Sequence, residues 1–368
     1  MATFVEAEVV EVIEENVGLV RVRVEAGASL FEAAGFPAML GPLQLGDRIV
    51  VNTTGIELGL GTGGVGFVLW NLDGAGPQDR GPGHVVKLRY TPWQMNVVAA
   101  EAPESPHHDA LAEASDLVGM PVVACGLHSQ IAGVAAGIKA VAPEARVGYL
   151  MTDGGALPLA WSRLVSELRA AGLVDSTCTY GHAFGGDLEA VNNFSGLAAL
   201  RHAAAADVAI VSPGPGVVGT ATTLGFSGIE QGQVLDAALA LQGRGYACLR
   251  ISFADARARH RGVSHHTLTA LGVAARERAT AVLPTLPSEE MDLIRRQLAT
   301  LGGRHDLVEE DGRPGLELLE SRRLRPTTMG RGTKEAPEAF LAAAAAGSAA
   351  GRALSSPPES SAAPGRGG

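Results

Sequence analysis

The chain has 368 residues, of which 46% are hydrophobic and only 18% charged, and its formal net charge is -10. A chain this apolar can bury a large core, which excludes an intrinsically disordered protein over most of the length. The negative charge balance excludes a broadly basic surface, so neither nucleic acid nor a membrane is an expected partner. The N-terminus has no signal-peptide pattern, no apolar run approaches the roughly 20 residues of a membrane span, and the three cysteines lie singly in apolar runs. We therefore expect a cytoplasmic protein with reduced thiols.

Residues 1–90 are predicted to form a small antiparallel β-barrel-like domain. Hydrophobic and polar residues alternate over residues 8–26, "EVVEVIEENVGLVRVRVEA", which is typical of a hairpin that turns at residues 14–18. Further strand-like runs follow within residues 45–72, and no long helical pattern separates them. The Gly- and Pro-rich residues 72–84 mark the end of this domain.

Residues 91–325 are predicted to form an α/β domain. Short runs rich in Val, Ile and Leu alternate there with helical stretches, which indicates a doubly wound, mostly parallel sheet with helices on both faces. The expected strands lie within residues 121–129, 146–155, 175–187, 207–216, 247–253 and 279–284, and the expected helices within 130–142, 158–172, 188–205, 233–242 and 288–302. Residues 326–368 are predicted to be an Ala-rich segment followed by a disordered Pro/Ser/Gly tail.

Polar side chains and glycines gather directly after the predicted strands rather than before them. In open α/β sheets, ligands bind at the carboxyl ends of the strands, where these loops lie. Imidazoles and carboxylates can supply acid–base or metal-ligand chemistry there, and glycines let a ligand approach the backbone. The candidate catalytic residues are His128, Asp153, His182, Asp187 and His265.

Several chemistries are compatible with these five residues. Together they could bind a Zn, Mn or Fe ion through nitrogen and oxygen, although their spacing matches no compact metal motif. Without a metal, a histidine could act as general base while an aspartate orients it, or the aspartates could merely cap the helices that follow. Ser129 and Ser264 are weaker candidates for a nucleophile, because adjacent residues in a strand seldom face each other. For the same reason, only one of His265 and His266 is expected to serve a site if that stretch is extended.

Residues 214–219, Gly-Pro-Gly-Val-Val-Gly, match the G-x-G-x-x-G pattern of dinucleotide-binding loops and follow a strand-like run. The helix that this pattern should open is interrupted at residues 225–228, and the nearest acid for a ribose, Asp236, lies inside a helical stretch. A standard NAD site is therefore disfavoured. A loop that binds a phosphate or carboxylate fits better, and a tight turn without a ligand is an equal alternative. The residues expected to bind the anion are Ser212, Gly214, Gly216, Gly219, Thr220 and Thr222.

Five segments of the chain carry a family resemblance. They are "LHSQ", "MTDGGALP", "GHAFGGDLEAVN", "SPGPGVVGTATTLGFSG" and "HRGVSHHTLTALG". Together they resemble the bacterial family called domain of unknown function 3866, over residues 1–325 and without the tail. The resemblance implies a bacterial, notably actinobacterial, cytoplasmic protein. It implies no activity, cofactor or catalytic residue.

The leading hypothesis is an enzyme, either a hydrolase or a group transferase, that acts on a small anionic or phosphorylated metabolite at the carboxyl edge of the sheet. The loop at residues 213–223 would hold the anion, and the histidines and aspartates would supply acid–base or metal chemistry. A non-catalytic metabolite-binding or regulatory protein is the alternative, and an NAD-dependent oxidoreductase is the third hypothesis. The sequence leaves the cofactor and the oligomeric state open, and it is compatible with a homo-oligomer.

Overall fold

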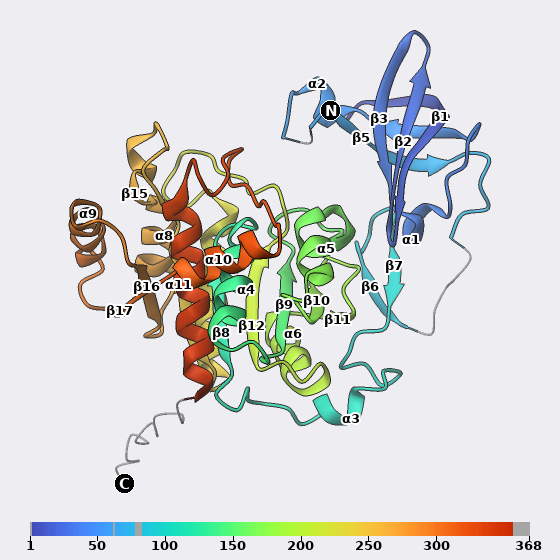
Figure 1. The fold of residues 1–368 in the computed structure, drawn as a ribbon. Helices are drawn as coiled ribbons and strands as arrows, with labels where there is room; N and C mark the ends of the chain where they lie inside the picture. Colours follow the sequence, from blue (N-terminus) through green and yellow to red (C-terminus); the bar gives the residue numbers. More distant parts are fainter. Residues whose placement is uncertain (1, 62, 78–82, 356–368) are drawn as a thin grey trace.

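The computed structural model describes residues 2–61, 63–77 and 83–355. A closed barrel at the N-terminal side lies beside a larger part in which helices flank a parallel sheet (Figure 1). This is the predicted fold class, an α/β protein with a small leading β domain. Residues 356–368, which include the Pro/Ser/Gly tail predicted to be disordered, lie outside the described residues.

Five strands form the closed N-terminal barrel. They are β1 (Phe4–Asn16), β2 (Leu19–Ala26), β3 (Ser29–Gly35), β4 (Arg48–Asn52) and β5 (Val65–Asn71), in the order β1-β2-β3-β5-β4. The strands β1 and β2 form the predicted hairpin, and Val20, Val22 and Val24 on alternate positions of β2 are buried inside the barrel. All the strand pairs are antiparallel except β3 and β5, which run parallel. Two short helices, α1 (Pro37–Leu40) and α2 (Thr54–Glu57), lie in the connections.

Eight parallel strands form the central sheet of the α/β part. They are β8 (Pro121–Cys125), β9 (Val147–Thr152), β10 (Ser176–Tyr180), β11 (Leu188–Ala190), β12 (Val208–Pro213), β13 (Arg244–Cys248), β16 (Thr280–Pro284) and β17 (Asp306–Glu310), in the order β11-β10-β9-β12-β8-β13-β16-β17. Strand β11 falls where the sequence predicts a helix, and β17 falls where it predicts no strand. The loop after β8 leads to one face of the sheet, whereas the loops after its neighbours β12 and β13 lead to the other. Ligands bind at such switch points in doubly wound sheets.

Helices cover both faces of this sheet (Figure 1). One face packs against α4 (Gln130–Val141), α5 (Arg163–Ala170), α10 (Arg313–Ser321) and α11 (Pro337–Arg352), and the other against α6 (Asn193–Ala198), α7 (Glu230–Ala240), α8 (His265–Thr269) and α9 (Ser288–Ala299). Successive strand residues alternate between the two cores, as Val122 and Val123 do. The helix α3 (His108–Leu111) precedes the sheet. Among the described residues, no helix combines the length and the apolar character that crossing a bilayer requires.

The Ala-rich segment forms the helix α11, which is almost wholly buried between α4 and the sheet. Small residues let the two helices touch backbone to backbone, with Gly133 and Gly137 on α4 and Gly347 on α11. A Cβ atom added to Gly137 would lie 2.8 Å from the carbonyl carbon of Ala344, well inside van der Waals contact. The helix α11 therefore completes the hydrophobic core on this face.

A hairpin of β6 (Val85–Lys87) and β7 (Met95–Val97) lies between the barrel and the sheet (Figure 1). The side chain of Lys87 is 1% exposed and forms an ion pair with Glu189 on β11. Its ammonium group also donates hydrogen bonds to the carbonyl oxygens of Thr179 and Ala183. The buried ammonium group of Lys87 thus links this connecting segment to the edge of the sheet.

Aromatic rings pack against one another where the barrel meets the α/β part. The rings of Phe67 and Trp161 pack edge to face with their centroids 5.2 Å apart, and those of Phe36 and Phe184 do so at 6.5 Å. Beside them lies an apolar hollow of about 390 Å³, which the loop after β9 also lines. Aromatic side chains from both parts thus pack together at their interface.

Candidate functional site

The predicted catalytic residues do not form one group. His128 follows β8, Asp153 follows β9 and His182 follows β10, whereas His265 begins α8. In the part of the chain that the structure describes, the one set of three metal-ligating side chains with mutually close ligand atoms contains only His265 of these residues. A single mixed metal site made of all five residues is therefore not formed.

His128 is held between a carbonyl oxygen and a serine hydroxyl at the carboxyl end of β8. Its Nδ1 lies 3.1 Å from the carbonyl oxygen of Pro213, and its Nε2 lies 2.6 Å from Oγ of Ser162. Because a carbonyl oxygen can only accept, Nδ1 carries the proton and the Ser162 hydroxyl donates to Nε2. Burial lowers the pKa of His128 to about 4, an effect that the Pro213 carbonyl partly offsets, so the ring is neutral at neutral pH.

Ser162 occupies the position directly before α5, where its Oγ also accepts a hydrogen bond from the backbone N–H of Val165 at 3.1 Å. This contact is a normal helix cap, and the sequence alone marks Ser162 as nothing more. The fold adds the imidazole of His128 from a loop 34 positions earlier in the chain. A serine hydroxyl that donates to a neutral histidine is the arrangement used for nucleophilic catalysis.

A polar hollow of about 510 Å³ opens beside His128. Its walls come from the loop after β8, the start of α5, the glycine-rich loop after β12 and residues 325–329. Arg163 and Arg325 both line it and are exposed, while Glu167 supplies one acidic group. The hollow therefore combines two cationic side chains with the backbone of Gly216, as the binding of a small anion requires.

Asp153 and His182 lie together beyond β9 and β10. The backbone N–H of His182 donates to Oδ2 of Asp153 at 3.1 Å, and Nδ1 of His182 accepts from the backbone N–H of Leu88 at 3.1 Å. Glu230, in the first turn of α7, lies close to Asp153 and accepts a hydrogen bond of 2.5 Å from the Thr152 hydroxyl. Burial raises the pKa of Glu230 to about 7, against the effect of the Thr152 hydrogen bond, and the charge of Asp153 raises it further.

This raised pKa makes a testable contribution to stability. Between pH 4.5 and pH 7 the folded chain keeps the Glu230 proton that the unfolded chain releases, so this group destabilises the fold as the pH rises. We expect Glu230→Gln to match the wild type near pH 4 and to exceed its free energy of unfolding by about 3 kcal/mol at pH 8. Denaturant unfolding at both pH values measures this difference, with the exposed Glu113→Gln as the control for loss of one negative charge. An equal difference at both pH values would contradict the burial of a protonated carboxyl group.

Asp187 lies beside the beginning of β10 rather than beyond its carboxyl end. Its carboxylate accepts hydrogen bonds from the backbone N–H and the hydroxyl of Thr177, at 2.9 and 3.0 Å. It also forms an ion pair of 2.7 Å with Arg169 on α5. These contacts join α5 to the sheet, and they place Asp187 away from His128 and His182.

The glycine-rich loop after β12 folds back on itself instead of opening a helix. Gly219 pairs with Phe226 in an antiparallel bridge, and α7 begins only at Glu230. The hydroxyls of Thr220 and Thr222 are bonded to each other at 3.0 Å and to the backbone of Gly225. These hydroxyls therefore shape the loop, and the strand–loop–helix context of a dinucleotide site is absent from this described segment.

The first half of the same loop packs against the loop after β9. The Ser212 side chain is buried, with its Oγ 3.3 Å from the hydroxyl of Tyr149. At Gly214 a Cβ atom would overlap the backbone carbonyl oxygen of Ala156, so only glycine allows this approach. Gly216 has a φ of 93°, a left-handed conformation that favours glycine, and it faces the hollow beside His128.

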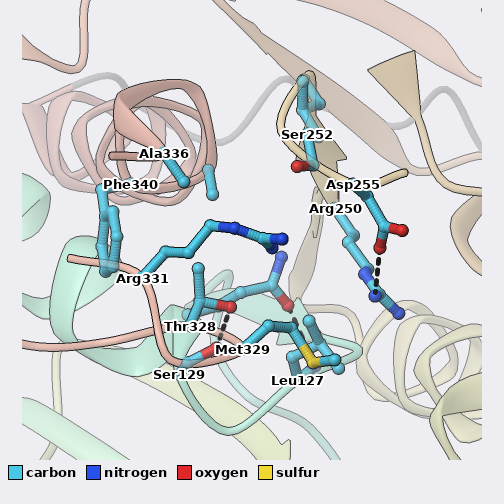
Figure 2. A pocket seen from close by; sticks show the side chains of 13 residues that line it. Leu127, Ser129, Arg250, Ser252, Asp255, Thr328, Met329, Arg331, Ala336 and Phe340 are labelled. Carbon is cyan, nitrogen blue, oxygen red and sulfur yellow. Dashed lines mark hydrogen bonds and ion pairs between the residues drawn. The ribbon is translucent and has the colours of Figure 1, made fainter. Parts of the chain in front are cut away.

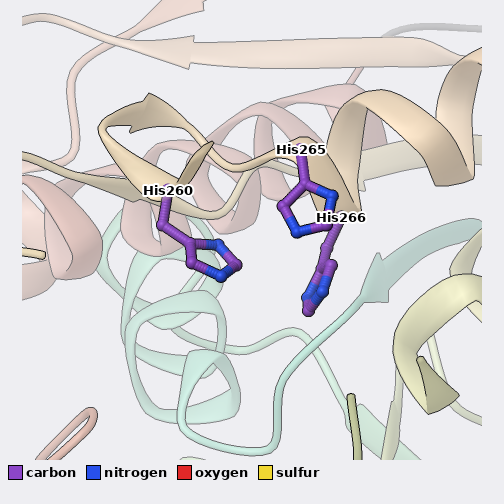
Figure 3. Close-up of side chains that lie close together, drawn as sticks. All are labelled: His260, His265 and His266. Carbon is purple, nitrogen blue, oxygen red and sulfur yellow. The ribbon is translucent and has the colours of Figure 1, made fainter. Parts of the chain in front are cut away.

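Three histidine rings meet at the beginning of α8 (Figure 3). His260 ends a short 3-10 turn (Ala258–His260), and His265 and His266 form the first turn of α8 after the N-cap Ser264. The expectation that only one of His265 and His266 serves a site applies to an extended stretch, and this condition is not met. The stretch is a helical turn, which brings the two ring centroids within 4.3 Å.

Burial is the main cause that lowers the pKa of each of these three histidines. It brings the pKa of His260 to about 4 and that of His266 to about 3, and it lowers the pKa of His265 as well. The positive charge of Arg250 adds to the shift at all three rings. All three imidazoles are therefore neutral at neutral pH, and each then has one ring nitrogen that can accept a hydrogen bond or bind a metal.

Arg250 connects the three histidines to a small hollow of about 30 Å³ between the loop after β8 and α11. Arg331 reaches the same hollow from the segment before α11 (Figure 2). The hydroxyls of Ser129 and Thr328 form a hydrogen bond of 3.0 Å at its floor, and Asp255 lies 3.9 Å from Arg250. Ser129 thus bonds to a threonine and not to its neighbour His128.

Residues 32–347 match the protein family described as "Protein of unknown function (DUF3866)". This match covers most of the chain and extends into the Ala-rich helix α11. The chain belongs to the DUF3866 family. No curated protein and no solved structure matches this DUF3866 protein.

Three of the side chains described above are not singled out by the sequence of this DUF3866 protein. Ser162 looks like an ordinary helix cap, Glu230 like a solvated first-turn acid, and His260 like part of a basic loop. Each acquires its chemistry from a partner that is distant in sequence or from burial. Only their position in the chain could have indicated these residues, because all three lie in connections that leave the carboxyl edge of the sheet.

Proposed function

We propose that this DUF3866 protein is a hydrolase or group transferase that acts on a small anionic or phosphorylated metabolite, with Ser162 as nucleophile and His128 as general base. One observation carries the proposal: the neutral imidazole of His128 accepts a hydrogen bond from the Ser162 hydroxyl, beside a hollow that two arginines line. The Pro213 carbonyl fixes the ring tautomer, the role that a carboxylate has in other nucleophile–histidine pairs.

The reaction follows from this geometry. The Oγ atom of Ser162 attacks the acyl carbon or phosphorus atom while its proton moves to Nε2 of His128, and His128 then gives the proton to the leaving group. Water, or an acceptor hydroxyl, releases the group from Ser162 by the reverse transfers. Arg163 and Arg325 would bind the anionic part of the substrate.

The test compares turnover of p-nitrophenyl phosphate and p-nitrophenyl acetate by four variants. Ser162→Ala and His128→Gln should each lower kcat/KM by at least about 100-fold, since general-base catalysis contributes that much. Ser321→Ala and His202→Gln are the matched controls and should keep the wild-type rate, because the first bonds to the carbonyl of Leu318 and the second to the carbonyl of Asp116, both outside the hollow. Undiminished turnover by Ser162→Ala would exclude the nucleophile, and a wild type that binds phosphate without any turnover would favour the metabolite-binding alternative.

We further propose that the protein acts on a small molecule in the cytoplasm of a bacterium. The three cysteines are free and buried, which suits the reducing conditions of the cytoplasm of a bacterium. The net charge of -10 favours a small-molecule ligand that a local pair of arginines attracts, rather than nucleic acid or a membrane surface.

A further inference from the structure

The three histidines at the start of α8 have no role in the proposed reaction. His260 is 1% exposed, and its ring centroid lies 4.9 Å from that of His265 and 5.0 Å from that of His266. One ring nitrogen of each histidine lies within 4.8 Å of one nitrogen of each of the others. Figure 3 shows the three rings turned toward a common space.

Hydrogen bonding leaves one buried nitrogen of this group without a partner. The Nε2 atom of His265 is buried and has no hydrogen-bond partner among the described residues. An unsatisfied buried polar atom destabilises a fold, so such atoms commonly mark the place of a ligand, an ion or a water molecule. Nothing in the packing of the three rings removes this cost.

Neighbouring groups hold two of the rings in place. Nδ1 of His260 lies 2.8 Å from Oγ of Ser264, and the ring of His266 stacks on Phe226 with centroids 4.0 Å apart and planes 5° apart. Such contacts orient metal-binding histidines in known sites. Arg259 donates a long bond of 3.4 Å to Nε2 of His260, but its side chain is exposed and can turn to solvent.

We propose that His260, His265 and His266 bind one zinc ion through three imidazole nitrogens, with the fourth position open to an anion. Three nitrogens at about 2.0–2.1 Å from zinc lie on the order of 3.4 Å apart, so small ring rotations close the present arrangement. A donor set of imidazoles without a described carboxylate or thiolate suits zinc and excludes magnesium and calcium, which require oxygen.

The surrounding charges decide what occupies the fourth position. Arg250 lies 3.3 Å from Nδ1 of His266, and Arg257 and Arg259 add positive charge around His260, while Asp255 is the acidic neighbour. Asp255 is already paired with Arg257 at 2.8 Å. These arginines weaken the attraction of the site for a cation but do not remove the three imidazole ligands, and an anion such as phosphate in the fourth position is attracted to both the metal and the arginines.

The test uses the untagged full chain after dialysis against a chelator, with zinc titrated in a calorimeter. We expect one zinc ion per chain, and we expect His265→Gln and His266→Gln each to weaken binding by more than about 100-fold. His202→Gln, the same change at a histidine that bonds to a backbone carbonyl, should bind zinc like the wild type. His265 and His266 are partly exposed, and circular dichroism of the metal-free variants shows whether they are folded.

Cobalt provides a second readout that does not depend on affinity. Bound Co²⁺ should give the intense visible bands of a four-coordinate nitrogen site, with no sulfur-to-cobalt charge transfer, and inorganic phosphate should shift these bands. Three results would each overturn the site. They are less than one bound zinc ion per chain, wild-type zinc affinity in folded His265→Gln, and sulfur-to-cobalt bands from the cysteines. Cobalt bands that phosphate leaves unchanged would overturn the anion position. The inference is independent of the proposed function, since Ser162→Ala and His128→Gln should bind zinc normally.

Discussion

Gly137→Ala should lower the free energy of unfolding by about 3 kcal/mol, although alanine is the better helix former by about 1 kcal/mol. The added methyl group would lie within 3.0 Å of three backbone atoms of Ala344 on α11. Because backbone atoms cannot turn aside as a side chain can, α4 and α11 must separate along their length. Separation opens the core that both helices share with the sheet.

Denaturant unfolding monitored by circular dichroism measures this loss. Gly61→Ala is the control, because a Cβ atom there meets no atom within 4 Å, and its effect should stay within about 0.5 kcal/mol. A Gly137→Ala protein as stable as the wild type would show that α4 and α11 do not pack at backbone distance.

Lys87→Met should lower the free energy of unfolding by about 3–5 kcal/mol, since it leaves the carboxylate of Glu189 without its buried partner. Methionine fills nearly the same volume as lysine, so the lower free energy of unfolding reflects the missing charge and not a cavity. The carbonyl oxygens of Thr179 and Ala183 lose their donor in the same variant. These groups lie at the carboxyl end of β10 and beyond it, so we expect the loop that carries His182 to be disordered as well.

A double-mutant cycle separates these causes. Lys87→Met combined with Glu189→Gln should regain a large part of the loss, because no buried charge remains unpaired. The exposed pair of Arg278 and Asp306 provides the comparison, and Arg278→Met should cost at most about 1 kcal/mol. If both lysine and arginine variants lose the same small amount, the Lys87 pair is solvated rather than buried.

The sequence predicts those parts of the fold in which the hydrophobic pattern changes clearly along the chain. The alternation in residues 8–26 gives the first hairpin of the barrel, and continuous apolar runs give six strands of the sheet. The Ala-rich segment carries no such contrast, because alanine is compatible with a buried helix and with a solvated one alike. The segment is buried because it packs against glycines on α4, which lie about 200 positions earlier in the chain. A local sequence pattern cannot indicate a contact between segments that far apart.

The sequence predicts that candidate site residues lie at the carboxyl edge of the sheet, but it does not predict which side chains they contact there. The loops after the strands do contain His128, His182 and His265, yet each of these meets different neighbours. The capping preference of Ser264 could have shown that His265 and His266 begin a helix and share a turn. The pairing of His128 with Ser162 depends on the path of α5 across the sheet, which only the tertiary structure provides.

The position of α11 has a consequence for how the protein is made. The ribosome synthesises the strands β8, β13 and β16 long before the helix that covers them, so the nascent chain presents their apolar side chains to water or to α4 alone. Native packing on that side must wait until residues 337–352 have left the exit tunnel. During translation, this face leaves apolar side chains exposed, which favours aggregation, and a chain truncated near residue 330 would be unable to bury them.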